Sequence, residues 1–137
     1  MSTDLPGATV HVDKDLVAAS ATPLVLAILA EGESYGYAIL RRVDELSGGR
    51  MAWTDGMLYP LLHRLDRLGL VTSSWGISPQ GRRRRHYAIT PAGLEALADR
   101  RQQWEMVTAA LGRVWDDAAR LATPPAQGPA APAAGIA

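Results

Sequence analysis

The pattern of an amphipathic helix runs directly into the pattern of a β-hairpin, and this adjacency limits the possible folds of the chain more than any other feature. A cap signal at Thr54 and a stop signal at Gly69 enclose the helical stretch, and Pro60 should bend its first turn. The apolar residues recur at the spacing of one buried face. They are Leu58, Leu61, Leu62, Leu65 and Leu68, and the opposite face carries Tyr59, His63, Arg64 and Arg67.

The hairpin that follows is strongly basic. A strand over 71–75, a turn over 76–81 and a returning strand that ends at Ile89 are expected, and alternation directs Tyr87 and Ile89 toward the core. Four consecutive arginines, Arg82 to Arg85, lie at the tip and at the start of the returning strand. Guanidinium groups neutralise phosphates and a helix can enter the major groove, so this pair of elements suits nucleic acid. A solvated arginine-rich loop is the alternative interpretation.

Two further helical patterns precede this region. The first covers 13–30 and is followed by Gly32, a stop signal of the left-handed type. It either begins at Pro23, with Thr22 as its cap, or runs through Pro23 with a kink. The second begins after a cap at Ser34 and ends at 48–49, and a very short strand is expected over 51–53. Its buried face should comprise Ile39, Leu40, Val43 and Leu46.

A long last helix and two loose ends complete the pattern. Thr90 caps this helix and Pro91 occupies its first position, from which it can extend to about Leu121. We expect a mainly α fold: a winged helix-turn-helix with a small antiparallel β-hairpin wing and a long C-terminal dimerisation helix. The expected segments are a flexible arm over 1–12, the DNA-binding domain over 13–90, the dimerisation helix over 91–122 and a disordered tail over 123–137.

Length and composition exclude several classes of protein. The 137 residues, 47% of them apolar, suffice for one domain with a core. No apolar run approaches the roughly 20 residues of a membrane span, and the N-terminus lacks the layout of a secretory signal. A cytoplasmic location without a membrane partner is therefore expected. The absence of cysteine excludes disulfides and thiolate metal sites.

The formal net charge of zero hides an uneven distribution. Residues 1–34 carry one lysine against five acidic residues, whereas residues 35–90 carry nine arginines against four acidic residues. The remainder holds four arginines and five acidic residues. Positive charge is thus concentrated in the middle of the chain, where a surface for nucleic acid would need it.

Several short motifs, in order and at the right spacing, resemble the PadR family of bacterial transcriptional regulators. The match covers roughly residues 15–121. The residues that carry it are Leu26 to Gly32, Tyr35 to Tyr37, Gly56 to Leu62, Arg64-Leu65, Gly69 to Val71, Gly81 to Tyr87 and Thr90 to Gly93. The resemblance implies a homodimer that binds a pseudo-palindromic double-stranded DNA operator as a repressor, with no catalytic activity and no cofactor.

The last helix independently indicates a partner, because it carries more apolar surface than one small domain can cover. Its single long helix resembles the short-tailed members of the family. The residues expected at the dimer interface are Leu16, Trp104, Val107, Leu111, Val114 and Trp115.

The resemblance also assigns DNA contacts. Tyr37 and Tyr59 match tyrosines that the family places near phosphates, although core packing is an alternative for Tyr37. Family members usually have Ser or Thr where this chain has Met57, so a hydrogen-bond donor is lost and only an apolar contact to a thymine methyl remains. The full set of expected DNA-binding residues is Tyr37, Thr54, Met57, Tyr59, His63, Arg64, Arg67, Arg82, Arg83 and Arg84. A solvated face is the alternative for Arg67, and His86 is expected to be packed.

The four tryptophans divide into two pairs. Trp53 and Trp75 flank the small sheet and are expected to pack in the core or at its edge. Trp104 and Trp115 lie about three helical turns apart and share a face. In multidrug-sensing members of the family, a tryptophan at the position that resembles Trp104 stacks on flat aromatic ligands, which makes Trp104 and Thr108 candidates for binding a planar aromatic effector. The alternative is that both tryptophans only pack the dimer.

An enzyme is not expected. The chain has no Gly-rich phosphate loop and no cysteine nucleophile, and His11, His63 and His86 lack the spacing of metal ligands. The competing function is a winged helix that contacts only proteins and does not bind specific DNA sequences.

Overall fold

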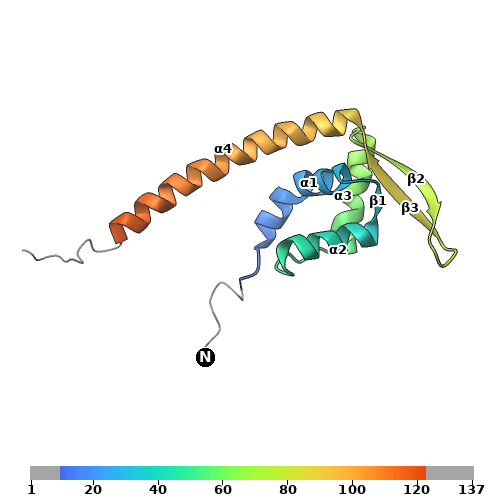
Figure 1. Ribbon diagram of the computed structural model, residues 1–137, viewed down its shortest axis with the longest axis horizontal. Helices are drawn as coiled ribbons and strands as arrows, with labels where there is room; N and C mark the ends of the chain where they lie inside the picture. Colours follow the sequence, from blue (N-terminus) through green and yellow to red (C-terminus); the bar gives the residue numbers. More distant parts are fainter. Residues whose placement is uncertain (1–9, 123–137) are drawn as a thin grey trace, which may run out of the picture. The chain divides into compact units, whose positions relative to one another are not determined.

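The structure is a computed structural model that describes residues 10–122, and its fold is mainly helical with one small sheet (Figure 1). The elements in chain order are α1 (Lys14–Ala30), β1 (Ser34–Tyr35), α2 (Gly36–Ser47), α3 (Asp55–Arg67), β2 (Val71–Ile77), β3 (Arg83–Ile89) and α4 (Pro91–Ala122). This order confirms the predicted fold class. The expected tail and most of the expected arm lie outside the described residues.

Helix α1 runs through Pro23 and does not begin there. Its start is set by Asp13, whose carboxylate accepts a hydrogen bond from the backbone N–H of Asp15 at 3.3 Å. A proline lacks the N–H that would bond to the carbonyl four residues earlier, so the helix continues with one bond fewer at that point. Gly32 follows the helix end with φ of 152°, which differs from the left-handed helical conformation predicted for it.

Helix α2 starts differently from the prediction. Ser34 does not cap it, because Ser34 pairs with Tyr87 in the sheet and the helix begins at Gly36. The strand predicted over 51–53 is also wrong, because these residues form no strand. The strand that joins the hairpin in the sheet is β1. The predicted end is correct: Gly48 has φ of 61° and ψ of 33°, a left-handed conformation that closes a helix at little cost only for glycine.

The predicted buried faces are largely confirmed, with one exception in each helix. Ile39 and Val43 of α2 are fully buried and Leu40 packs against the core, but Leu46 is 51% exposed. Four of the five leucines of α3 are buried, whereas Leu68 is 62% exposed because it lies beyond the last helical turn. The cap of α3 is the predicted one, since the N–H of Met57 donates to the Thr54 hydroxyl at 3.3 Å.

The sheet has the order β1-β3-β2, and both pairings are antiparallel. The hairpin register pairs Val71 with Ile89 and Ile77 with Arg83, so β2 is longer than predicted. Strand β1 reaches only His86 and Tyr87, which leaves the outer half of β3 without a strand on that side among residues 10–122. Tyr87 is 1% exposed and Ile89 packs against the core, as predicted.

One core holds α1, α2, α3 and the sheet together. It is built from apolar side chains of the three helices and both long strands: Ala21, Val25, Leu26, Ile28, Leu29, Ile39, Val43, Leu58, Leu61, Leu62, Leu65, Val71 and Tyr87. Burial of each large side chain stabilises the fold by roughly 1.5–3 kcal/mol before conformational entropy is counted. The core fixes α3 and the hairpin relative to each other, which determines the geometry of the surface described next.

Helix α4 begins where it was predicted to begin. The Thr90 hydroxyl accepts a bond from the N–H of Gly93 at 3.0 Å and donates to the Gly69 carbonyl at 2.7 Å.

The chain divides into two compact units, one up to Arg100 and one from Arg101 onward, so most of α4 belongs to the second unit.

Candidate nucleic-acid interface

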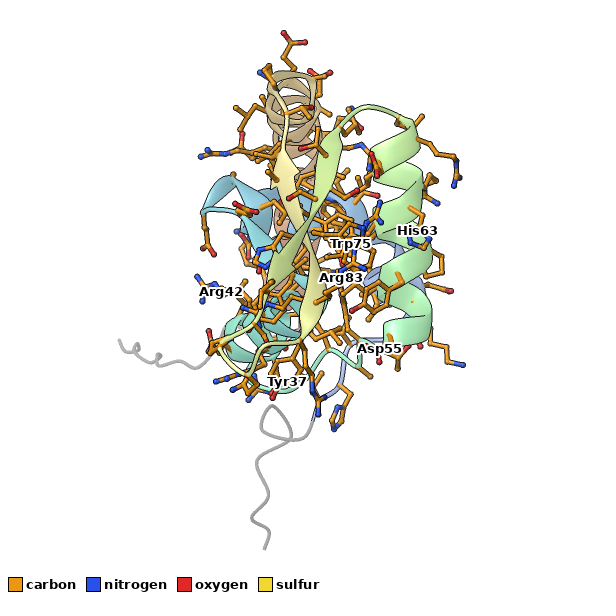
Figure 2. All side chains as sticks on the ribbon, turned by 90° about the vertical axis from the view of Figure 1, so that its right-hand side faces the viewer. Tyr37, Arg42, Asp55, His63, Trp75 and Arg83 are labelled. Atoms are coloured by element: carbon orange, nitrogen blue, oxygen red, sulfur yellow. The ribbon has the colours of Figure 1, made fainter. Side chains whose placement is uncertain are left out.

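Helix α3 presents a polar outer face. Its leucines point into the core, and His63, Arg64 and Arg67 are exposed. Figure 2 shows His63 on the outside of α3. Exposed basic and hydrogen-bonding groups on a helix of this length are suited to contacts in a DNA groove.

Tyr59 extends from α3 to the start of α2. Its hydroxyl lies so close to Gly36 that a Cβ added at Gly36 would be 2.0 Å from the Tyr59 oxygen and 2.6 Å from Cζ. Any larger residue at position 36 would therefore push the tyrosine away. Tyr59 remains 36% exposed, so the ring is held by contact with Gly36 while part of it stays accessible.

Tyr37 follows on the first turn of α2 and is 62% exposed. The Arg41 guanidinium lies 5.9 Å from its ring centroid. Core packing, the alternative considered for Tyr37, is therefore wrong, because the ring is on the surface.

The hairpin, the start of α2 and Tyr59 together enclose an open cleft of about 460 Å³. It lies beside the outer half of β3, which within residues 10–122 has no paired strand on the β1 side. The cleft is lined by Tyr35, Gly36, Tyr37, Tyr59, Ser78, Gln80 and the four residues Arg82 to Arg85. None of these lining residues is acidic. The structure thus brings Tyr37, Tyr59 and the predicted wing arginines into one site that combines positive charge with phenolic hydroxyls.

Arg84 has a different environment from its neighbours. Its guanidinium lies 3.5 Å from the Tyr35 ring centroid, and its Nε donates to His86 Nε2 at 3.4 Å. His86 Nδ1 lies 3.5 Å from a carboxylate oxygen of Glu33. Arg84 is half-buried and supported on two sides, and His86 is packed as expected.

Three predicted residues lie on the other flank of α3. Thr54, Met57 and Arg64 line a second cavity of about 480 Å³ between α3 and the beginning of α1, and Met57 packs against the core. The Thr54 hydroxyl is engaged in capping α3. The structure therefore separates these residues from the cleft that holds the tyrosines and wing arginines.

The sequence patterns missed part of this surface. Trp75, expected to pack in the core or at the edge, lies on the edge strand β2 and is 57% exposed, with Arg83 and Arg85 beside it, so only core packing is wrong. Tyr35, Gly36 and Arg85 also line the cleft without having been singled out as DNA-binding residues. The alternation of the returning strand was the available signal, since it places Arg83 and Arg85 on the same face as Tyr87 but beyond the end of the core. Trp53, by contrast, packs against the core as expected.

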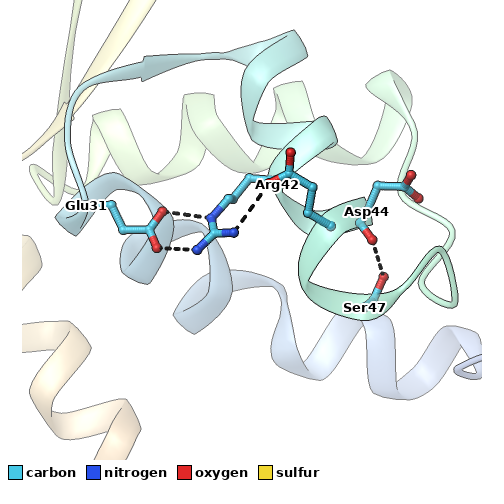
Figure 3. A network of polar contacts seen from close by, with 5 residues as sticks. Glu31, Arg42, Asp44 and Ser47 are labelled. Atoms are coloured by element: carbon cyan, nitrogen blue, oxygen red, sulfur yellow. Dashed lines mark hydrogen bonds and ion pairs between the residues drawn. The ribbon is translucent and has the colours of Figure 1, made fainter.

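A polar network joins the end of α1 to α2 (Figure 3). The Arg42 guanidinium donates to both carboxylate oxygens of Glu31, at 3.0 and 2.8 Å, and also to Glu45 at 3.4 Å. The hydrogen bonds from Arg42 lower the pKa of Glu31 below its ordinary value of 4.5. Glu31 likewise raises the pKa of Arg42. This pairing neutralises Arg42, so its charge is directed at α1 and not at the cleft.

Helix α4 carries an exposed apolar stripe. Val107 is 49% exposed, Leu111 41%, Val114 64% and Trp115 63%, while Trp104 is half-buried. The Thr108 hydroxyl donates to the Trp104 carbonyl at 2.8 Å, so it is already bonded within the helix. On α1, Leu16 is 56% exposed. The residues predicted at a dimer interface are thus accessible in the single chain.

Within residues 10–122, no group of three or more histidine, aspartate or glutamate side chains is placed to hold a metal ion. In the same range, no helix has the combination of length and apolar character that crossing a membrane requires.

Comparison with known proteins gives a consistent result. The model of the Transcriptional regulator PadR-like family matches residues 25–99. Transcriptional regulator Rv3488 of Mycobacterium tuberculosis is 44% identical over 70 residues, which cover 50% of this chain and 64% of that protein. Transcriptional regulator YqjI of Escherichia coli is 29% identical over 84 residues, 61% of this chain and 39% of that protein. The chain thus spans less than two thirds of the length of these two relatives.

Solved structures share the fold. A transcriptional regulator from Clostridium thermocellum has a TM-score of 0.67 and 26% identity, covering 73% of this chain and 97% of that one. A PadR-like transcriptional regulator from Bacillus cereus has a TM-score of 0.66 and 26% identity, covering 74% of this chain and 97% of that one.

Proposed function

The chain belongs to the PadR-like family of transcriptional regulators, and we propose that it represses transcription as a homodimer bound to a pseudo-palindromic operator. The observation that carries this proposal is the cleft beside β3, where four arginines and three tyrosines meet without an acidic residue in the lining. Guanidinium groups and phenolic hydroxyls are the side chains that proteins use to hold DNA phosphates.

In the proposed complex, α3 enters the major groove and the hairpin holds the adjacent backbone. His63 and Arg67 face the bases from α3, while Arg82 and Arg83 at the hairpin contact phosphates. Tyr37 and Tyr59 donate hydrogen bonds to phosphates between these two elements. Met57 and Arg64 contribute from the opposite flank of α3, where Met57 offers only apolar contact.

The apolar stripe of α4 supports the dimer. A helix with several large apolar side chains 41% exposed or more is stabilised when another helix covers it. A second copy of this chain offers the same stripe, which gives a two-fold interface. The two copies of α3 would then lie about 34 Å apart and would enter successive major grooves on one face of the DNA.

The proposed effector is a planar aromatic molecule that stacks on Trp104 near the dimer axis. The indole gives a large polarisable surface, and the half-buried position of Trp104 leaves part of it free. Thr108 contributes through its methyl group, because its hydroxyl is bonded to Trp104. Titration with planar cationic dyes and phenolic acids should quench tryptophan fluorescence in the wild type and less in Trp104→Leu. Equal quenching in both proteins would contradict this role.

Selection of bound duplexes from a random pool tests the function directly. We expect the selected sequences to share two half-sites related by a two-fold axis and about one helical turn apart. Binding of every duplex with the same affinity, or of none, would instead support a winged helix that contacts only proteins.

A further inference from the structure

The hairpin carries an exposed tryptophan with two arginines beside it. Trp75 is 57% exposed, and the Arg83 and Arg85 guanidinium carbons lie 4.4 and 5.1 Å from its ring centroid. Figure 2 shows Trp75 and Arg83 together on the side of the molecule that bears the hairpin and α3. A large apolar side chain with this exposure contributes little to the core, and most of its ring is available for other contacts.

The strand register explains why the three side chains meet. Trp75 is paired directly with Arg85, and Arg83 is paired with Ile77, the next residue of β2 on the same face. Cross-strand and diagonal neighbours on one face lie within reach of an aromatic ring. A guanidinium stacked on an indole is attracted by the ring and loses part of its rotamer freedom before any ligand binds.

A second set of contacts links this group to α3. Arg85 Nη2 donates to the Ser73 hydroxyl at 2.8 Å, and that hydroxyl donates to a carboxylate oxygen of Asp66 at 3.0 Å. Asp66 belongs to α3. A continuous row of contacts therefore runs from α3 through Asp66, Ser73, Arg85 and Trp75 to Arg83.

We propose that Trp75 is a positioning residue for DNA binding, which holds the Arg83 and Arg85 guanidiniums in place for the phosphates of the duplex that α3 enters. The proposal rests on the proposed function of the chain. The stacking orients the two arginines before DNA arrives, and the Asp66–Ser73–Arg85 contacts fix that orientation relative to α3. Arg84 stands apart from this group, because it is stacked on Tyr35.

The test is a double-mutant cycle on the affinity for a selected duplex. Trp75→Leu keeps an apolar side chain and removes the stacking surface, and should weaken binding by roughly five- to thirty-fold, because the two arginine side chains must then be ordered when DNA binds. Trp75→Phe should bind more tightly than Trp75→Leu. The salt dependence of Trp75→Leu should stay near that of the wild type, because both arginines remain.

In the background Arg83→Ala with Arg85→Ala, the change Trp75→Leu should have little further effect, since nothing is left to position. Ser74→Ala, on the opposite face of β2, is the control and should bind as the wild type does. Wild-type affinity in Trp75→Leu would overturn the proposal, and so would a weakening that persists in full without the two arginines. If the selection with the wild type yields no duplex that it binds specifically, the proposed function itself is refuted. Circular dichroism and urea unfolding of each variant verify that the fold is retained.

Discussion

At the scale of single residues, the geometry of the cleft depends on the close approach of two residues from different helices. Gly36 lets the Tyr59 hydroxyl approach the first turn of α2, where a Cβ would lie 2.0 Å from it. Tyr59 thus has a defined position although 36% of it is exposed. Arg42 is paired with Glu31 at 2.8 Å and does not line the cleft.

Gly36→Ala should move Tyr59 and weaken DNA binding without unfolding the protein. The steric cost is limited, because the added Cβ would meet the far end of the Tyr59 side chain and the half-exposed ring can swing toward solvent. We expect duplex affinity to fall while the urea midpoint changes little. In a Tyr59→Ala background, Gly36→Ala should leave the affinity unchanged. An equal further decrease in that background would show that Tyr59 is not the group displaced.

The Glu31–Arg42 pair predicts an effect of pH on stability. Hydrogen bonding lowers the Glu31 pKa in the folded state below its ordinary value of 4.5. The stabilisation is therefore fully present above pH 4.5 and disappears as the pH falls through the lower folded value. Glu31→Gln should show a smaller drop in the urea midpoint than the wild type when the pH is lowered from neutral to well below the ordinary Glu pKa. An identical drop in both proteins would mean that the pair does not contribute.

At the scale of elements, the sequence correctly predicted the helix ends that depend only on residues close together in the chain. The Thr54 cap of α3, the Thr90-Pro91 start of α4 and the Gly48 end of α2 involve groups a few residues apart, and all were predicted from sequence. Ser34 was misread because its partner, Tyr87, is far away in the chain. The exposure of Trp75 was not predicted, because strand alternation assigns a residue to one face but does not say how far along the hairpin the core extends. The approach of Tyr59 to Gly36 likewise exists only in three dimensions.

Thr54→Ala should destabilise the protein by about 0.5–2 kcal/mol, the usual effect of removing an N-cap side chain. The Thr54 hydroxyl accepts from the Met57 N–H at 3.3 Å, and alanine leaves that N–H without its side-chain partner. Urea unfolding at neutral pH measures the change. Thr54→Ser keeps the hydroxyl and should stay close to the wild type; if serine were as destabilising as alanine, the capping bond would not be the cause.

At the scale of the whole molecule, the proposed repressor requires two copies joined through α4. Leu111 and Val107 lie in the middle of the exposed stripe, at 41% and 49% exposure. Leu111→Asp should place a charge in the interface and shift the protein from dimer to monomer in sedimentation velocity, with a fall in operator affinity. Arg113→Asp also introduces an acidic side chain on α4 and serves as the control. A Leu111→Asp protein that sediments as the wild type would contradict the proposed interface.

The central claim is that the hairpin arginines, Arg82 to Arg85, hold DNA phosphates, and the salt dependence of duplex binding tests it most directly. The logarithm of the wild-type binding constant should fall steeply with the logarithm of salt concentration. Arg82→Ala with Arg83→Ala should flatten that slope by roughly one unit for each phosphate that the variant no longer neutralises. Arg113→Ala with Arg120→Ala removes the same charge from α4 and should leave the slope unchanged. A slope that is the same in the wild type and in the hairpin variant would contradict the claim.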